Sequence, residues 1–444
     1  MIFEPELECL DPGAMRALQD ARLRALVARV AARVPMYAER LAAAGVRPGD
    51  VAGVDDLVRL PVTRKDDLRT HYPFGLLAVP RGELRRVHAS SGTTGRATVV
   101  AYTAADLALF AEVNARALAM AGAEPGMMLH NAYGYGLFTG GLGIHGGGER
   151  LGMNVVPVSG GMTDRQVTLL LDFRPDVITC TPSYALTLAT ELQRRGIAPE
   201  ALSLRFALLG AEPWTEGMRQ QVDAGLGVRS TNIYGLSEII GPGVSNECVE
   251  ARDGSHVMED HFYPEILDPD TGAPVPDGED GVLVITTLTK EALPLLRYWT
   301  GDVTSLVRGR CACGRTLVRM RQVKGRTDDM LIIRGVNVYP SQVEAVLARI
   351  PELAPHYRLV VSRAGTLDDI HVDAEVSEAF FRAAGGTLAG DEAGEHPAAA
   401  LRRRIAGLVR DVIGIGMSVA LVAPGTAPRS EGGKLNRVVD RRSR

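Results

Sequence analysis

Short apolar runs alternate with helical stretches between residues 99 and 209, and this alternation constrains the fold more than any other feature. The apolar runs lie near Gly, Pro or Ser and occupy residues 99–102, 154–158, 176–179 and 206–209. Between them, residues 165–173 and 183–194 carry apolar side chains at helical spacing. The sequence therefore predicts an α/β architecture with substantial sheet.

Two flanking segments have a different rhythm. Residues 10–45 carry apolar positions at helical spacing, which predicts an amphipathic helical start. Residues 264–306 are β-rich, and turn signals occur at 268–272 and at 276–278. Helices are thus expected at the start of the chain and a β-rich region after residue 264.

The last part of the chain predicts a small second domain. A strand and helix alternation runs from Gly325 to about residue 439, a length within the common range for domains. We place the boundary near Asp328, which gives domains 1–328 and 329–444. Residues 385–400 are rich in Gly, Ala and acidic residues without periodicity, so we expect a solvent-exposed insertion there.

The composition is that of a globular enzyme-sized chain. Hydrophobic residues make up 46% and charged residues 23% of its 444 residues. The net charge is −4 and basic residues are scattered, so neither a nucleic-acid partner nor a membrane partner is expected. No signal peptide, membrane span or disulfide framework is expected, and cytoplasm is the predicted compartment.

A loop rich in glycine and hydroxyl groups precedes the apolar run at 99–102. Its residues are Ser90, Ser91, Gly92, Thr93, Thr94, Gly95, Arg96, Ala97 and Thr98. Such a loop can wrap phosphate oxygens, because glycine allows tight backbone geometry and hydroxyl groups donate hydrogen bonds to anions. It is not a Walker A loop, and taken alone it fits a polar surface loop equally well.

Five further motifs follow this loop in order, at residues 210–214, 234–238, 297–302, 325–329 and 432–434. With the loop, the set resembles the adenylate-forming enzymes, which include acyl-CoA synthetases, luciferases and peptide-synthetase adenylation domains. The resemblance is closest to the phenylacetate-CoA ligase family. The stretches that carry this closer resemblance are 133–141, 157–161, 241–244 and 332–341.

The resemblance implies both a fold and an activity. The fold is a large multi-lobed N-terminal adenylation domain with a small mobile α+β C-terminal domain. In the implied activity, an aryl carboxylate attacks the α-phosphate of ATP to give an acyl-adenylate and pyrophosphate, and the thiol of coenzyme A then displaces AMP. Because carboxylate and triphosphate repel each other, catalysis must neutralise charge and hold an in-line geometry. A homodimer is also implied.

The same resemblance assigns nucleotide-binding roles. The loop at 90–95 would hold the β- and γ-phosphates, and Glu238 would help to bind Mg²⁺, which commonly takes one or two carboxylates plus phosphate oxygens. Tyr234 would stack on adenine, although it also fits an ordinary core aromatic. Asp302 would accept the ribose hydroxyls and Arg326 would support the ribose and phosphates. The other residues implied at the nucleotide are Gly210, Ala211, Glu212, Asn232, Ile233 and Gly235.

Lysine is scarce in this chain, and most of its basic residues are arginines. The only lysines are Lys65, Lys290, Lys324 and Lys434. A lysine kept among arginines hints at a need for a compact point charge. By resemblance, Lys434 would bridge the attacking carboxylate and the α-phosphate, and Lys65 would be a second phosphate or substrate contact. Asp328 fits the hinge about which the small domain rotates.

The acyl pocket is implied less directly. Where the family pattern is roughly His-Tyr-Gly-Ala-Glu, this chain has Gly146 in place of the aromatic residue, which would open volume for a larger or ring-substituted acid. The other candidate pocket residues are Tyr135, Phe138, Ile239, Ile240 and Pro242.

Four metal-binding side chains suggest a second kind of site. Cys311 and Cys313 supply two thiols, and the resemblance implies that Cys248 and His256 pack nearby. Three thiolates and one imidazole make a closed tetrahedral zinc set of the structural type. The alternatives are His261 as the imidazole, or four unlinked reduced side chains.

Two other functions fit some of these features. An adenylating enzyme could pass the acyl group to a carrier-protein thiol, an amine or another nitrogen nucleophile instead of coenzyme A. A nucleotide-binding regulator without catalysis is a further alternative. The joint presence of Lys434, Glu238 and Asp302 argues against the regulator, because a sensor would not need all three.

Overall fold

The computed structural model describes most of the chain, namely residues 1–89, 98–327, 331–333, 336–338, 340–364, 367–388, 396–429 and 437–441. The predicted phosphate loop at 90–95, the predicted hinge Asp328 and the predicted catalytic Lys434 lie outside these described residues. The domain boundary near Asp328 therefore stays a prediction.

A nine-stranded sheet forms the centre of the large N-terminal part, with strand order β13-β14-β9-β8-β7-β6-β5-β3-β4. The strands are β3 (Met128–Asn131), β4 (Asn154–Val156), β5 (Val177–Cys180), β6 (Phe206–Gly210), β7 (Arg229–Leu236), β8 (Gly241–Glu247), β9 (Ser255–Val257), β13 (Leu306–Val307) and β14 (Arg319–Met320). Strands β4, β3, β5, β6 and β7 are parallel, and the remaining pairs are antiparallel. The predicted α/β architecture is confirmed.

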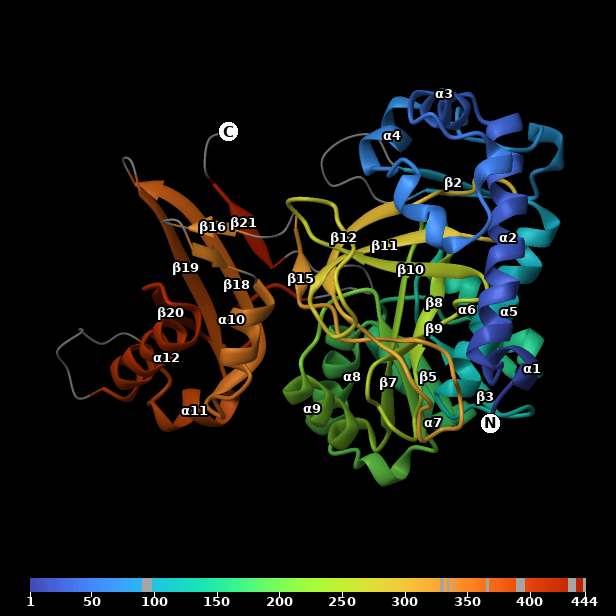
Figure 1. Cartoon of the computed structure of the whole chain (residues 1–444). Coiled ribbons are helices and arrows are strands. Elements are labelled where there is room, and N and C mark those ends of the chain that lie inside the picture. Colours follow the sequence, from blue (N-terminus) through green and yellow to red (C-terminus); the bar gives the residue numbers. More distant parts are fainter. Residues whose placement is uncertain are drawn as a thin grey trace.

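Helices connect and cover these strands, as Figure 1 shows. They are α5 (Ala104–Met120), α6 (Gly140–Leu151), α7 (Thr163–Phe173), α8 (Pro182–Arg194) and α9 (Glu216–Leu226). Local sequence explains where several begin. Thr181 accepts a hydrogen bond from the backbone of Tyr184 at the start of α8, and Pro182 occupies the first helical position.

The predicted helical start is confirmed as two long helices with a short one before them. They are α1 (Pro5–Glu8), α2 (Pro12–Arg33) and α3 (Pro35–Ala43). Helix α2 ends where Val34 adopts an extended conformation, because residues before proline disfavour helical geometry. Helix α4 (Lys65–Thr70) follows and carries Lys65 in its first turn.

A second, antiparallel sheet has strand order β10-β11-β12-β15. Its strands are β10 (Phe262–Leu267), β11 (Gly281–Thr287), β12 (Tyr298–Thr304) and β15 (Gly325–Arg326). The predicted turn at 268–272 follows β10, and the Asp268 carboxylate accepts hydrogen bonds from the backbone N–H groups of Asp270 and Thr271. A short antiparallel pair, β1 (Arg86–Ala89) and β2 (Val99–Tyr102), flanks the phosphate-loop segment in sequence.

The C-terminal part has its own sheet and its own hydrophobic core (Figure 1). The sheet order is β20-β19-β18-β21. Its elements are β16 (Leu331–Ile333), β17 (Val336–Val338), α10 (Pro340–Leu347), β18 (Leu353–Ala364), β19 (Leu367–Val376), α11 (Glu378–Ala383), α12 (Pro397–Ile413), β20 (Ser418–Val422) and β21 (Val438–Asp440). The α+β character expected of this part is confirmed.

The predicted insertion at residues 385–400 is wrong at its C-terminal end. Helix α12 begins at Pro397, and Ala398 and Ala399 are buried in the core of this part. The His396 ring accepts a hydrogen bond from the backbone of Ala398 and so caps the helix. The first turn of α12 is rich in alanine and has no large apolar residue, so its sequence shows little helical periodicity. Its small side chains nevertheless pack closely in the core.

Among the described helices, none combines the length and the apolar character needed to cross a membrane.

Buried ion pairs fasten helices α1 and α5 to later segments of the large part. Arg116 and Asp260 are both fully buried, and two guanidinium nitrogens of Arg116 lie 3.1 Å from Asp260 Oδ1. Arg315 Nε lies 2.5 Å from Glu8 Oε2, and both of these residues are also fully buried. Removal of one partner would leave a charge unpaired in the core, which is far costlier than loss of an exposed pair.

We predict that Asp260→Ala lowers the free energy of unfolding of the large part by about 3–5 kcal/mol, because the buried Arg116 then loses its hydrogen-bonded carboxylate and keeps only the more distant Glu8 and Glu112. Asp253→Ala is the matched control, since its carboxylate is half exposed beside Arg319 and should cost less than about 1 kcal/mol. Urea unfolding followed by tryptophan fluorescence measures both, because the two tryptophans, Trp214 and Trp299, lie in the large part. Equal losses for the two variants would contradict the prediction.

Candidate functional site

The motif at 210–214 begins where β6 ends. A side chain at Gly210 would place a Cβ atom 2.1 Å from the carbonyl oxygen of Ile233 on the neighbouring strand β7, so only glycine fits there. Ala211 follows with a positive φ of 72°, which turns the chain sharply at the carboxyl edge of the parallel strands. This edge is where ligands commonly bind in open α/β sheets.

Three of the predicted nucleotide residues meet directly. Tyr234 Oη donates a hydrogen bond to Asp302 Oδ2 at 2.5 Å, and Arg326 Nη1 lies 3.1 Å from Asp302 Oδ1. Asp302 and Arg326 are also register partners on β12 and β15. Burial, and then the adjacent Asp302 charge, raise the pKa of Tyr234 well above its ordinary value. A carboxylate can accept about four hydrogen bonds, so the chemistry of Asp302 suits hydroxyl donors.

Glu212 and Asn232 are held by hydrogen bonds from neighbouring elements. Glu212 Oε1 accepts from the backbone N–H of Ser183 at the start of α8, at 2.6 Å. Burial raises the pKa of Glu212. Asn232 Oδ1 accepts from the indole N–H of Trp214 at 3.0 Å, and the backbone N–H of Asn232 donates to Glu247 at 2.8 Å.

Sequence reasoning missed the residues that support Asn232 from behind. Glu247 on β8 forms a nearly buried pair with Arg219 of α9, whose Nη1 and Nη2 lie 2.9 and 3.0 Å from its two carboxylate oxygens. The Arg219 guanidinium also lies over the Trp214 ring, 4.6 Å from its centroid. Only Trp214 belongs to a recognisable motif, so the sequence carried no signal for the other two.

Glu238 lies in the turn that joins β7 and β8. It is 6% exposed, and no residue in the described part of the chain donates a hydrogen bond to its carboxylate. The turn is held through other atoms: Lys290 Nζ donates to the Glu238 carbonyl at 3.0 Å, and Tyr102 Oη donates to the Ile240 carbonyl at 2.9 Å. Burial lowers the pKa of Lys290 to about 8. Sequence analysis gave neither Lys290 nor Tyr102 a role.

Lys65 is brought toward the same region by strand pairing. Thr63 pairs with Tyr298 at the start of β12, and the backbone N–H of Trp299 donates to the Thr63 carbonyl at 2.9 Å. Helix α4, with Lys65 in its first turn, is therefore joined to the strand that carries Asp302.

The predicted acyl-pocket residues divide into two groups. Tyr135 Oη accepts from Asn131 at 2.7 Å and lies 3.1 Å from the His145 ring, and Phe138 follows it and is partly exposed. A side chain at Gly146 would meet Ala111 of α5 at 3.6 Å, an ordinary contact, so a larger residue would find room there.

The second group follows Glu238 in the chain. Ile239 and Ile240 are fully buried in the main core, so in this conformation their side chains contact other core residues. Pro242 lies on β8, and its carbonyl accepts a hydrogen bond from Asn114 at 3.0 Å.

Gly235, one of the predicted nucleotide residues, lies within β7, where a side chain would collide with the carbonyl oxygen of Gly241.

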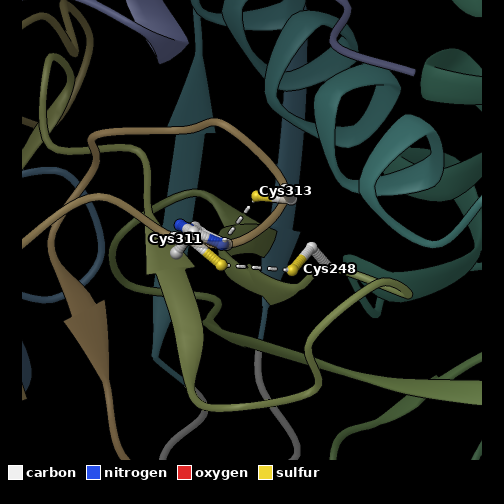
Figure 2. Close-up of side chains that lie close together, drawn as sticks. Cys248, Cys311 and Cys313 are labelled. Atoms are coloured by element: carbon white, nitrogen blue, oxygen red, sulfur yellow. Dashed lines mark hydrogen bonds between the residues drawn. The ribbon is translucent and has the colours of Figure 1, made fainter.

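The four predicted metal-binding residues meet in the structure. The Sγ atoms of Cys248 and Cys311 are 3.7 Å apart, and Cys313 Sγ lies 3.5 Å from His256 Nε2. All four candidate ligand atoms lie within 4.8 Å of one another. Figure 2 shows the three thiols turned toward a common point. We call this set, Cys248, His256, Cys311 and Cys313, the thiol cluster.

The spacing of the thiol cluster matches a tetrahedral zinc site. Zn–S bonds of about 2.3 Å place two sulfurs about 3.8 Å apart, and a sulfur and an imidazole nitrogen about 3.5 Å apart. The alternative imidazole, His261, lies elsewhere, with Nε2 3.0 Å from Asp260. Glu112, Asp260 and His261 also group closely, but Arg116 already supplies the positive charge there.

Two family models match the chain. The model of the AMP-binding enzyme family matches residues 87–289, and that of the AMP-binding enzyme C-terminal domain matches residues 335–442. The first includes the motifs around β6 and β7, and the second covers most of the C-terminal part.

Similar proteins are known over the full length. The chain is 66% identical to a phenylacetate-coenzyme A ligase of Thermus thermophilus over 444 residues, which cover 100% of both chains. It is 48% identical to that of Escherichia coli, covering 100% of this chain and 99% of the relative.

A solved structure, 2-hydroxyisobutyryl-CoA ligase in its postadenylation state with an acyl-AMP, matches with a TM-score of 0.90 and 28% identity over 98% of this chain and 91% of that one. The same enzyme in its thioesterification state, with CoA, gives a TM-score of 0.72 at 29% identity over 99% of this chain and 92% of that one. These full-length similarities and the convergence of the nucleotide motifs lead to one conclusion. The chain belongs to the phenylacetate-coenzyme A ligase family of AMP-binding enzymes.

Proposed function

We propose that this protein is an ATP-dependent aryl-acid–CoA ligase whose acid is of the phenylacetate class. It forms an acyl-adenylate and pyrophosphate, and then an aryl-acyl-CoA and AMP. The observation that carries the proposal is the 66% identity over the whole chain to a phenylacetate-coenzyme A ligase. The meeting of Tyr234, Asp302 and Arg326 supports it, because a buried carboxylate is a suitable acceptor for ribose hydroxyls.

In the first half-reaction, the chain must hold ATP so that the acid's carboxylate approaches the α-phosphate in line. Asp302 accepts the ribose hydroxyls, Tyr234 contacts the adenine, and the 210–212 segment lines the base. Lys434, which lies outside the described residues, supplies a positive charge between carboxylate and α-phosphate, and Lys65 is a second contact to phosphate or substrate. Each of these groups acts where negative charge gathers or where the nucleotide must be oriented.

Mg²⁺ fits the chemistry of the Glu238 turn. The Glu238 carboxylate is nearly buried and has no hydrogen-bond partner among the described side chains, so its oxygens remain free for a cation. Mg²⁺ typically binds one or two protein carboxylates together with phosphate oxygens. When bound, it would neutralise charge on the β- and γ-phosphates; Glu238 is the residue that would hold it.

We propose that the second half-reaction needs a rotation of the C-terminal part, residues 329–444, about Asp328. The two TM-scores of 0.90 and 0.72 against two states of one ligase support this, since the same fold matches differently according to state. In the conformation described here, Ala348 of the C-terminal part lies against α9 at Gly217, so this part is docked on the large part. Small contacts of this kind permit domain motion.

We further propose that the thiol cluster holds a structural Zn²⁺. The observed sulfur–sulfur and sulfur–nitrogen distances support this ion. With four protein ligands the site is closed, which is typical of structural and not catalytic zinc. Cys248 directly follows β8, and Cys313 lies in the loop after β13. The ion would therefore fasten the end of β8 to that loop.

A homodimer and a cytoplasmic location are implied by the family resemblance and stay predictions. Static light scattering of the purified protein tests the first. A dimer would give twice the chain mass of 47.5 kDa, whereas the single-chain mass would contradict it.

The acid and the acceptor are tested together by measuring AMP release with ATP and Mg²⁺ across a panel of aryl acids, each with and without CoA. We expect CoA-dependent AMP release and phenylacetyl-CoA as product. Ring-substituted acids should also react, because Gly146 leaves room beside α5. Adenylate formation without turnover of CoA would contradict the ligase and favour a carrier-protein or amine acceptor.

We predict that Lys434→Ala slows acid-dependent exchange of pyrophosphate into ATP by about 100-fold or more, because a preorganised charge at the reacting phosphate is lost. Formation of phenylacetyl-CoA from synthetic phenylacetyl-adenylate should stay within about threefold of the wild-type rate. Lys324→Ala is the matched control, since Lys324 is an exposed lysine paired with Asp280. An equal loss in both half-reactions would remove Lys434 from its assigned role.

We expect the purified protein to contain about one zinc ion per chain, measured by atomic absorption. Cys313→Ser should lower both the zinc content and Tm, because three remaining ligands bind the ion less tightly. Cys9→Ser is the control, since Cys9 lies outside the thiol cluster. The assignment would be contradicted if protein from cells grown with added zinc contained no zinc, and if Cys313→Ser left its Tm unchanged.

A further inference from the structure

Lys290 is a buried lysine that none of the assigned roles uses. It is one of four lysines among 49 basic residues, and it is 1% exposed. It lies in the segment between β11 and β12. Two contacts receive its ammonium group: the carbonyl oxygen of Glu238 at 3.0 Å and the face of the Tyr102 ring, whose centroid is 5.3 Å away.

Burial of an ammonium group is costly, so its retention calls for a specific partner. A charged group taken out of water loses several kcal/mol of solvation, on the order of what one buried ion pair must recover. A methionine of similar length would fill the same space without this cost. Filling space is therefore not enough to explain a lysine at position 290. Its hydrogen bond to the Glu238 carbonyl is the feature that a methionine would lack.

A lysine suits this position better than an arginine would. The ammonium is a compact point donor on a linear stem, whereas a guanidinium is a planar fork that needs several acceptors. Here one carbonyl and one aromatic face are the contacts, and a cation over an aromatic face is itself a favourable interaction. The chain uses arginine at almost every other cationic position.

The Lys290 segment is itself fixed to helix α5. The Asp106 carboxylate accepts hydrogen bonds from the backbone N–H groups of Glu291 and Ala292, at 2.7 and 2.9 Å. Asp106 is fully buried and lies in the first turn of α5. The backbone next to Lys290 is thus held in place by hydrogen bonds to Asp106.

Three side chains from separate segments hold this turn. Besides Lys290, Tyr102 of β2 donates to the carbonyl of Ile240, and Thr139 Oγ1 lies 3.2 Å from Ser237 Oγ. These hydrogen bonds reach the backbone and Ser237 and not the Glu238 carboxylate, whose charge, with that of Asp106, also acts on the Lys290 ammonium. An anchor on the Glu238 carbonyl holds the backbone from which that carboxylate extends.

We propose that Lys290 is a positioning residue for the metal-bound nucleotide: its hydrogen bond to the Glu238 carbonyl orients the Glu238 carboxylate toward Mg²⁺. The inference rests on the proposed magnesium role of Glu238. Residues that orient a metal ligand typically change metal affinity or activity by about 10–100-fold when they are removed. Lys290 acts through Glu238 and contacts neither acid nor nucleotide.

Calorimetry of ATP binding, without acid or CoA, tests this directly. ATP affinity is measured with Mg²⁺ and again in EDTA, and the ratio is the metal-dependent gain. Lys290→Met removes the donor and keeps the length, and it should lower the gain about tenfold. Affinity in EDTA should stay within about twofold of the wild-type value, because the adenine and ribose contacts remain.

Three further variants sharpen the result. Lys324→Met, an exposed lysine variant, should keep the wild-type gain. Tyr102→Phe removes the second backbone anchor of the same turn and should lower the gain by a smaller factor. Lys290→Gln, which keeps a donor on a shorter side chain, should fall between Lys290→Met and wild type, and it replaces Lys290→Met if that variant does not fold.

A folded Lys290→Met with the wild-type gain would overturn the inference, as would an equal loss of affinity with and without Mg²⁺. Failure of both Lys290 variants to fold would also overturn it, since the lysine would then be purely structural. Glu238→Gln tests separately whether Glu238 binds Mg²⁺. If this variant kept the wild-type metal-dependent gain, Glu238 would have no magnesium role, and the inference about Lys290 would fail with it.

Discussion

The hydrogen bond from Tyr234 to Asp302 joins the two sheets that carry the proposed nucleotide site. Tyr234 ends the parallel part of the nine-stranded sheet, and Asp302 lies in the antiparallel sheet beside Arg326. The turn with Glu238 follows Tyr234 by four residues, and Lys65 is tied to the strand of Asp302 through Thr63. A shift of one sheet relative to the other would therefore separate the groups that we propose to act on one nucleotide.

The supporting contacts behind this junction are polar and buried. Glu247 links Arg219 to the backbone of Asn232, and Lys290 links the β11–β12 segment to Glu238. Buried polar groups are costly when they lose a partner, so such contacts give a site one defined geometry. Glu247 is also directly followed by Cys248 of the thiol cluster, so the cluster lies at the end of a strand that supports the proposed nucleotide site.

Periodicity predicted the α/β class and a small C-terminal domain of strands and helices, and the family resemblance implied a shared site for Tyr234, Asp302 and Arg326. The thiol cluster was predicted from the family resemblance, which implied that Cys248 and His256 pack near Cys311 and Cys313, and the four side chains do meet. Neither the periodicity nor the resemblance predicted Lys290, Arg219 or Glu247, since each acts through a contact between segments distant in sequence. The start of α12 was missed because alanines bury well without forming a strong apolar pattern.

A crystal structure of the protein with ATP, Mg²⁺ and phenylacetate is the most direct test of the proposed nucleotide site. The account predicts an acyl-adenylate with its ribose hydroxyls hydrogen-bonded to Asp302 and its adenine against Tyr234. A nucleotide bound elsewhere, with no contact between its ribose and Asp302, would contradict it.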